Sequence, residues 1–150
     1  FEALFRQVKN RKRFEPGLSP RFFYDLSGID FDHRVLIARA NNRDVAAITL
    51  GITGSCAVYL YGATNEQGRE MNAGYLLTWE GIRLARSLGV GTYDLGGIDS
   101  VENPSVTEFK RRTGGREVSA PGPFEARPRW LTSQIILAAE QAKRRYSGVS

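Results

Sequence analysis

Lys110, Arg111 and Arg112 form a run of three cations that leads directly into the flexible turn Thr113-Gly114-Gly115. No Asp or Glu occurs between residues 110 and 116, and Arg116 adds a further cation. Such a cluster attracts phosphates, either of RNA or of a nucleotide-linked substrate. A lysine held here could also stabilise an oxyanion, because a preorganised cation matters most where charge develops in the transition state. The pattern favours an anionic ligand over a merely solvated basic surface.

A second candidate segment, residues 93–99, reads Tyr-Asp-Leu-Gly-Gly-Ile-Asp. It places Asp94 in a short strand that ends in Gly96 and Gly97, where the backbone can approach a ligand closely. Asp94 could orient an amine or a hydroxyl group. Alternatively, nearby backbone amides satisfy its carboxylate, and the glycines serve only the turn.

The polar stretch 62–71 predicts a loop that leads into a helix beginning at Asn72. Free N–H groups at a helix start form a natural site for an anion or an oxyanion. The stretch matches neither Gly-x-Gly-x-x-Gly nor a Walker loop, since residues 69–74 read Arg-Glu-Met-Asn-Ala-Gly. Nucleotide hydrolysis is therefore not indicated.

The chain holds one cysteine, Cys56, and one histidine, His33. This content excludes a disulfide framework and a multi-cysteine zinc or iron–sulfur site, and we expect no metal. Cys56, Ser55 and Ser27 lack the surroundings of an activated nucleophile, so covalent hydrolase chemistry is disfavoured.

The composition is that of an ordinary globular domain. The 150 residues include 21 Lys and Arg against 16 Asp and Glu, and 41% are hydrophobic. We therefore expect one domain over residues 1–150 with a real core. The longest uncharged apolar stretch, 46–61, is too short to span a membrane, and we expect a cytoplasmic protein. The chain begins with Phe1 and not Met, which suggests a fragment, and a partner domain could be missing.

Hydrophobic periodicity and turn residues predict the order ααβββαβαβα. The first two helices cover residues 1–13 and 21–26, and Ser19-Pro20 begins the second. Three antiparallel strands follow, with turns at 41–44 and 53–55. The remaining elements are a helix from Asn72 to Gly89, a strand at 93–95, a helix from 103–104, a strand at 116–119 and a final helix at about 130–146.

Four segments, in this order, resemble the Fem family of aminoacyl-tRNA-dependent peptidyltransferases. They are Tyr-Gly-Ala-Thr at 61–64, Asn-Ala-Gly-Tyr-Leu-Leu-Thr-Trp-Glu at 72–80, Tyr-Asp-Leu-Gly-Gly-Ile at 93–98, and Phe-Lys-Arg at 109–111 with Gly-Gly at 114–115. The likeness is close over residues 56–120 and loose elsewhere. It implies an α/β (α+β) fold: a single GNAT-like acyltransferase domain with a mixed central sheet flanked by helices, similar to the second domain of Fem-type transferases.

The resemblance also implies a reaction. An acceptor amine attacks the aminoacyl ester at the 3′ end of tRNA, a peptide bond forms, and tRNA is released. Aminoacyl-tRNA is then a co-substrate, and neither a metal nor another cofactor is needed. The implied acceptor is a peptide-bearing small molecule, such as a UDP-linked muropeptide of cell-wall synthesis, or a nucleoside or short peptide of antibiotic assembly.

Residue roles follow from the matched positions. Phe109 and Lys110 stand at the family's catalytic Phe-Lys pair, and Tyr61 matches a tyrosine of its acceptor site. Lys110 would stabilise the tetrahedral oxyanion or hold the tRNA terminus, and Phe109 could pack on the terminal adenosine. We further predict substrate contacts from Thr64, Asn72, Asp94, Gly96 and Gly97. Charge assigns tRNA phosphates to Arg111, Arg112 and Arg116.

Two other functions stay open at this stage. The first is an acyl-CoA-dependent N-acyltransferase of the GNAT type, although residues 69–74 lack the Gln/Arg-x-x-Gly-x-Gly/Ala phosphate loop. The second is a non-catalytic RNA-binding module, which the basic runs alone would support. Typical Fem proteins are about twice as long, so a homo-oligomer or a missing partner domain could complete the site.

Overall fold

The structure is a computed structural model that describes residues 1–12, 18–119 and 121. The chain divides into two compact units, residues 1–116 and 117–150. The second unit lies almost wholly outside the described residues, as does the predicted helix at 130–146. The expectation of one domain over residues 1–150 stays a prediction.

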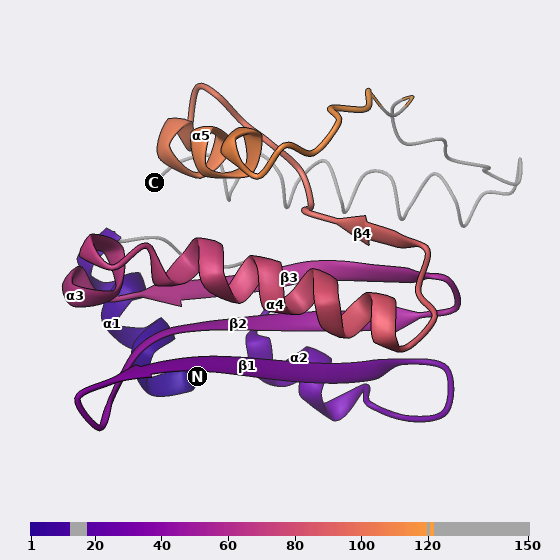
Figure 1. The fold of residues 1–150 in the computed structure, drawn as a ribbon, viewed down its shortest axis with the longest axis horizontal. Helices are drawn as coiled ribbons and strands as arrows, with labels where there is room; N and C mark the ends of the chain where they lie inside the picture. Colours follow the sequence, from indigo (N-terminus) through magenta and orange to yellow (C-terminus); the bar gives the residue numbers. More distant parts are fainter. Residues whose placement is uncertain (13–17, 120, 122–150) are drawn as a thin grey trace, which may run out of the picture. The chain divides into compact units, whose positions relative to one another are not determined.

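The first unit is built on a four-stranded mixed sheet of order β1-β2-β3-β4 (Figure 1). Strands β1 (Asp32–Ala40), β2 (Arg43–Thr53) and β3 (Cys56–Thr64) run antiparallel as predicted, and β4 (Thr92–Asp94) pairs parallel with β3. The tight β1–β2 turn uses Asn41 and Asn42, which both adopt positive φ. Asparagine tolerates this conformation better than most residues do, which explains the polar turn in the sequence.

Helices cover both faces of the sheet (Figure 1). Helices α1 (Glu2–Lys12) and α2 (Pro20–Asp25) lie on one face, and α4 (Ala73–Ser87) lies on the other. Ser19 caps α2 by accepting a hydrogen bond from the Phe22 N–H at 3.2 Å, as its position before Pro20 predicts. Helix α4 also provides the crossover that a parallel β3–β4 pair requires. These elements confirm the predicted α/β fold class with a mixed sheet.

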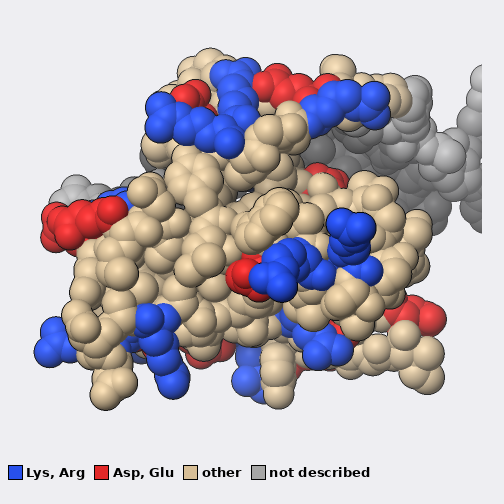
Figure 2. Space-filling view, viewed as in Figure 1, with Lys and Arg blue, Asp and Glu red and all other residues tan. Residues whose placement is uncertain are grey.

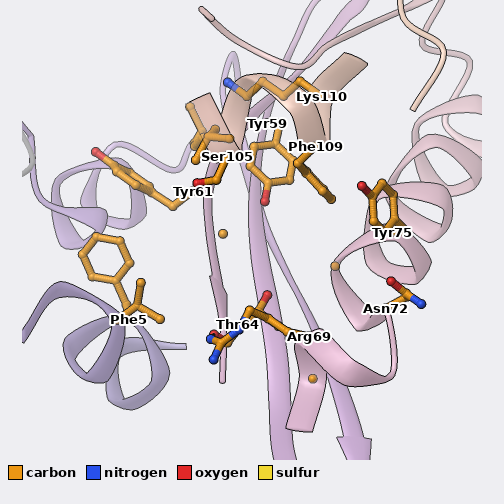
Figure 3. Close-up of a pocket in the computed structure, with 16 residues that line it drawn as sticks. Phe5, Tyr59, Tyr61, Thr64, Arg69, Asn72, Tyr75, Ser105, Phe109 and Lys110 are labelled. Atoms are coloured by element: carbon orange, nitrogen blue, oxygen red, sulfur yellow. The ribbon is translucent and has the colours of Figure 1, made fainter. Parts of the chain in front are cut away.

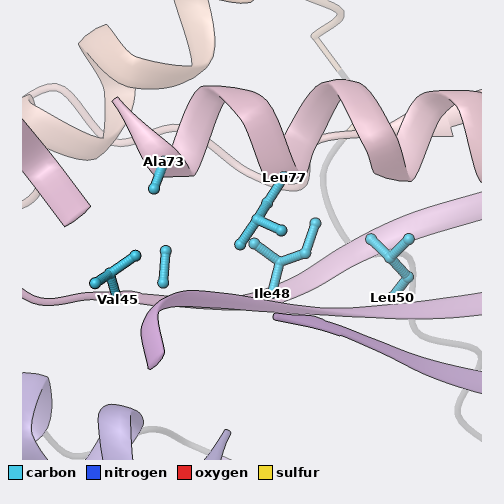
Figure 4. Close-up of a cluster of buried hydrophobic side chains, with 6 residues drawn as sticks. Val45, Ile48, Leu50, Ala73 and Leu77 are labelled. Atoms are coloured by element: carbon cyan, nitrogen blue, oxygen red, sulfur yellow. The ribbon is translucent and has the colours of Figure 1, made fainter. Parts of the chain in front are cut away.

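Strand β2 forms the centre of the core because it is buried on both faces. Toward α4, Ile48 and Leu50 pack beneath Ala73 and Leu77 (Figure 4). Toward α1, Ala47 belongs to a second cluster, which contains Leu4, Phe5, Val8 and Ala63. Successive side chains of β2 therefore point alternately toward α4 and toward α1, and both helices hold the sheet in place.

Two predicted elements differ in the structure. Residues 62–71 do not form one loop, because β3 continues to Thr64 and the short helix α3 (Glu66–Glu70) follows. Helix α3 forms because the Asn65 side chain caps it, accepting from the Gly68 N–H at 2.8 Å. Residues 116–119 are exposed and form no strand, since no strand of the described chain pairs with them. Within the described residues, no helix is long and apolar enough to cross a membrane.

Candidate functional site

The site begins where β4 leaves the sheet. Strand β4 pairs with β3 only at Cys56, Ala57 and Val58. Beyond Val58, β3 continues to Thr64, and its outer edge has no strand partner in the described chain. Backbone N–H and C=O groups along this edge are therefore free to bond a ligand.

A β-bulge at Leu60 changes the direction of the side chains along this edge. Leu50 pairs with Tyr59 and Thr49 pairs with Tyr61, so Leu60 is the extra residue in β3. Without the bulge, Tyr59 and Tyr61 would face the same way. Instead Tyr59 packs against the core under α4, and Tyr61 packs against the core under α1. The two tyrosines thus reach around both sides of the free edge.

A cavity of about 420 Å³ lies against this edge (Figure 3). Its walls come from α1, β3, α3, α4 and α5 (Pro104–Arg112). The side chains labelled in Figure 3 are Phe5, Tyr59, Tyr61, Thr64, Arg69, Asn72, Tyr75, Ser105, Phe109 and Lys110.

Lys110 enters the cavity from the last turn of α5. Its ammonium donates to the Gly97 carbonyl oxygen at 2.6 Å. This carbonyl follows a tight turn in which Gly96 has φ +75° and its N–H donates to the Asp94 carboxylate at 2.7 Å. Glycine suits this left-handed conformation because it has no Cβ. Asp94 therefore shapes the turn that holds Lys110.

Burial lowers the pKa of Lys110, and the negative charge of Asp94 opposes that shift. Burial acts this way because it disfavours the charged form of an amine. Lys110 thus releases its proton more readily than a lysine in water does. An ammonium of this kind can stabilise an oxyanion and can also donate a proton to a leaving group.

Phe109 forms part of the same wall on the neighbouring position of α5. Its ring centroid lies 4.7 Å from that of Tyr75 on α4. The Phe109 ring also lies over Gly74 at the start of α4, close enough that a Cβ there would be in van der Waals contact with it at 3.5 Å. The two rings form an aromatic surface on which a planar group could stack.

Tyr61 lines the opposite wall. Its hydroxyl donates to the Leu18 carbonyl oxygen at 2.6 Å, and its ring packs edge-on against Phe5 and Phe23. Burial raises the pKa of Tyr61. The phenol proton is thus already engaged, and the phenol oxygen keeps the capacity to accept a hydrogen bond from a substrate.

Helix α4 begins after Asn72, as predicted, but without a side-chain cap. Asn72 is left-handed, with φ 55° and ψ 30°, and its side chain makes no capping hydrogen bond. The following N–H groups, of Ala73 and Gly74, have no backbone partner in the described chain. The helix therefore begins from a turn conformation that glycine would ordinarily supply, and its first amides remain available to an anion.

The structure brings five predicted site residues to one cavity: Tyr61, Thr64, Asn72, Phe109 and Lys110. Asp94, Gly96 and Gly97 lie outside its lining and act through the turn that holds Lys110. Arg111, Arg112 and Arg116 are exposed and do not line the cavity. Their assignment to tRNA phosphates stays a prediction.

The basic surface over α5 is interspersed with acids (Figure 2). Arg112 forms an ion pair with Glu108 at 2.7 Å, one turn earlier on the helix. A phosphate would have to compete with this carboxylate for the guanidinium. Arg112 is therefore a weaker phosphate ligand than its place in the basic run suggests.

Several cavity residues were not predicted from the sequence. Phe5 and Tyr75 read as core positions of amphipathic helices, and Arg69 fell in the expected loop. Tyr59 was not predicted because the bulge at Leu60 cannot be read from the sequence. Burial raises the pKa of Tyr59 to about 12. The sequence signal that could have identified Arg69 is its positive charge just before the predicted helix start at Asn72.

The sequence is similar to a known protein family and to a known enzyme. Residues 1–111 match the family model described as "Acetyltransferase (GNAT) domain". The "Lipid II:glycine glycyltransferase" of Staphylococcus haemolyticus (strain JCSC1435) is 27% identical to this chain over 114 residues. That match covers 73% of this chain and 27% of the relative's length.

Solved structures with similar folds include an aminoglycoside acetyltransferase from an uncultured soil metagenomic sample, in complex with sisomicin. It has a TM-score of 0.58 and 18% identity, and the match covers 83% of this chain and 85% of that one. A tetramutant of the BH1408 protein from Bacillus halodurans has a TM-score of 0.53 and 17% identity, with 83% and 88% covered. At these identities the likenesses show the fold alone.

Proposed function

We propose that this chain, which belongs to the acetyltransferase (GNAT) domain family, transfers an aminoacyl group from aminoacyl-tRNA to the amine of a peptide-bearing acceptor. The product is a new peptide bond, and free tRNA is released. The acceptor is a cell-wall precursor peptide or an intermediate of peptide-antibiotic assembly. Such a reaction would take place in the cytoplasm, where aminoacyl-tRNA is made.

One observation carries this proposal. The Phe109-Lys110 pair and Tyr61, which sequence resemblance assigns to the reaction and the acceptor, line the same cavity from different elements. They are far apart in the sequence, and the cavity at the free edge of β3 has all three in its lining. The similarity to a glycyltransferase named for lipid II supports an aminoacyl group as the transferred unit and a peptide-bearing molecule as the acceptor.

The residues present can supply the chemistry of this step. The neutral amine nitrogen attacks the ester carbonyl carbon, and a C–N bond forms while the carbonyl oxygen becomes an oxyanion. Lys110 faces the cavity with N–H donors beyond the one given to Gly97, so it can stabilise that oxyanion. The C–O bond to the ribose then breaks, and the proton lost by the amine passes to the ribose oxygen.

Positioning is the protein's other contribution. Phe109 and Tyr75, whose rings are tilted against each other, offer an aromatic surface to the terminal adenosine of tRNA. The free edge of β3 offers backbone groups to the acceptor. Each contact fixes one reactant relative to Lys110. Within this account, the protein needs no strong base, because the acceptor amine attacks in its neutral form.

A second candidate function is N-acyl transfer from acyl-CoA. The specific observation in its favour is the left-handed Asn72, with the unpartnered amides of Ala73 and Gly74 behind it. The left-handed turn leaves these amides available to an anion, although the sequence lacks the usual glycine. Those amides would hold the pyrophosphate, and the acyl thioester would supply the activated carbonyl.

A donor comparison separates the two functions. The 150-residue chain is incubated with a radiolabelled mixed aminoacyl-tRNA pool, or with radiolabelled acetyl-CoA, and with a UDP-linked muropeptide or short peptides as acceptors. We expect label to move from tRNA to an acceptor amine, and we expect the Lys110→Met variant to lose this transfer. Transfer from acetyl-CoA alone would replace the proposal with the second function. Binding of tRNA without transfer from either donor would indicate an RNA-binding module.

A further inference from the structure

Within the described residues, the formal charges that line the cavity are all positive. Lys110 and Arg69 are its charged lining residues, and no Asp or Glu lines it. They enter from different sides: Lys110 comes from α5, and Arg69 comes from α3 on the far side of the aromatic walls (Figure 3). A cavity with this charge distribution favours an anionic ligand.

The guanidinium of Arg69 is largely uncommitted. Its one hydrogen bond given by the structure is a long contact of 3.3 Å from Nη1 to the Thr64 carbonyl oxygen. By contrast, Arg34 and Arg39 pair with carboxylates at 2.7 Å and 2.6 Å. No ion pair to Arg69 occurs in the described part of the chain, although acids flank it on α3. Most of its N–H fork is therefore available to a planar oxyanion.

The backbone beneath Arg69 is held firmly. The neighbouring Gly68 is buried, and a Cβ there would overlap the Val45 carbonyl of β2. The Asn65 N–H donates to the same carbonyl at 3.0 Å, and the Asn65 side chain accepts from the Gly68 N–H at 2.8 Å. Helix α3 is thus fixed to the sheet, so Arg69 extends into the cavity from a rigid base.

The surroundings of Arg69 add to the site. Thr64 lines the cavity beside it, and its carbonyl oxygen accepts from Arg69. Asn72 lines the cavity from the α4 side, and its side chain is not used as a helix cap (Figure 3). Between these polar groups and Lys110 lie five aromatic residues: Phe5, Tyr59, Tyr61, Tyr75 and Phe109. A ligand with an oxyanion at one end and an apolar or peptide body could place the oxyanion at Arg69 and the body against these aromatic side chains.

We propose that Arg69 binds a carboxylate or phosphate of the acceptor, so that the cavity selects anionic peptide acceptors with the amine directed toward Lys110. The assignment of this oxyanion to the acceptor rests on the proposed function. In that function, Lys110 contacts the reacting carbonyl of the donor, and Arg69 lies across the cavity from Lys110. We therefore assign the oxyanion that Arg69 binds to the acceptor, which is the molecule that carries the amine.

Binding measured without tRNA tests this proposal. The probes are alanyl-alanine, alanyl-alanine amide and the amide of alanyl-phosphoserine, titrated into the 150-residue chain by calorimetry or NMR. The variant is Arg69→Gln. The matched control is Arg86→Gln, an exposed arginine on α4 that does not line the cavity. Circular dichroism of each variant checks that it is folded.

We expect the acid to bind about tenfold more tightly than its amide to the unmodified chain, as a charge-assisted hydrogen bond allows. Arg86→Gln keeps this preference and Arg69→Gln removes it. A preference for the phosphoserine peptide over the acid would identify phosphate as the natural oxyanion. Equal binding of acid and amide, no binding of any probe at millimolar concentration, or an unchanged preference in Arg69→Gln would overturn the proposal.

This result is independent of the transfer reaction. If the Arg69-dependent preference is present but no donor gives transfer, the oxyanion site stands and the proposed function falls. If transfer occurs and Arg69→Gln leaves the preference unchanged, the function stands and the oxyanion site falls.

Discussion

The ammonium of Lys110 lies 2.6 Å from the carbonyl oxygen of Gly97, thirteen residues earlier in the chain. The carbonyl is held in place by the turn that Asp94 closes through the Gly96 N–H. A single carboxylate therefore affects Lys110 in two ways: it shapes the hydrogen-bond partner, and its charge favours the ammonium form. The structure thus shows Asp94 supporting Lys110, and the predicted contact of Asp94 with substrate stays a prediction.

Replacing Asp94 with Asn should change the pH dependence of transfer. Asn can still accept from the Gly96 N–H, so the turn persists, but the negative charge that raises the pKa of Lys110 is lost. Since the reaction uses protonated Lys110, activity falls as pH rises through this pKa. The alkaline limb of kcat/KM should therefore move to lower pH in Asp94→Asn.

The matched control is Asp99→Asn. Asp99 lies in the same segment, but its carboxylate accepts from the N–H groups of Val101 and Glu102 and does not influence Lys110. Its alkaline limb should stay in place. An unchanged limb in Asp94→Asn would contradict the electrostatic link between Asp94 and Lys110.

Gly68→Ala should destabilise the fold by about 1–3 kcal/mol, the range for forcing extra atoms into a packed region. The added Cβ would overlap the Val45 carbonyl, a backbone group that cannot move without disturbing β2. Gly91→Ala is the control, because a Cβ there meets nothing within 4 Å. Denaturant unfolding of both variants measures the difference. Equal stabilities would mean that α3 is not fixed to the sheet as described.

Two neighbouring leucines on α4 test the core. Leu77 is 4% exposed and packs over β2, whereas Leu76 is 55% exposed. Leu77→Ala should cost about 2–5 kcal/mol in free energy of unfolding, because it leaves a cavity in the core. Leu76→Ala should change stability by no more than about 0.5 kcal/mol, as surface substitutions usually do. Thermal or urea unfolding gives both values. Similar losses of unfolding free energy in the two variants would contradict the packing of the Leu77 face of α4 against the sheet.

The elements with strong local signals were predicted correctly. Ser19 followed by Pro20 specified the start of α2, and Asn41-Asn42 specified a tight turn. Both depend on a few adjacent residues whose backbone preferences are distinct. Phe109, Lys110 and Tyr61, which resemblance and not periodicity singled out, line one cavity, and their roles stay predictions.

The features that were missed depend on tertiary contacts. The bulge at Leu60 has no glycine or proline beside it that would predict it. It is seen only in the register of β3 against β2. Helix α3 is a polar segment held by the cap of Asn65 and by its contact with Val45. The start of the helix at Asn72 was predicted correctly, but its left-handed backbone without a side-chain cap was not. Arg69 lines the cavity from α3, a helix that the sequence did not predict.

The central claim is that Lys110 acts on the reacting carbonyl and not merely on tRNA. The direct test is single-turnover transfer from aminoacyl-tRNA, measured alongside the Kd for tRNA, in Lys110→Met and Arg111→Gln. Lys110→Met should slow transfer by about 100-fold or more, the usual effect of removing an oxyanion-stabilising group, with little change in Kd. Arg111→Gln should weaken tRNA binding and leave the rate at saturation nearly unchanged. Parallel losses of rate and affinity in both variants would contradict the account.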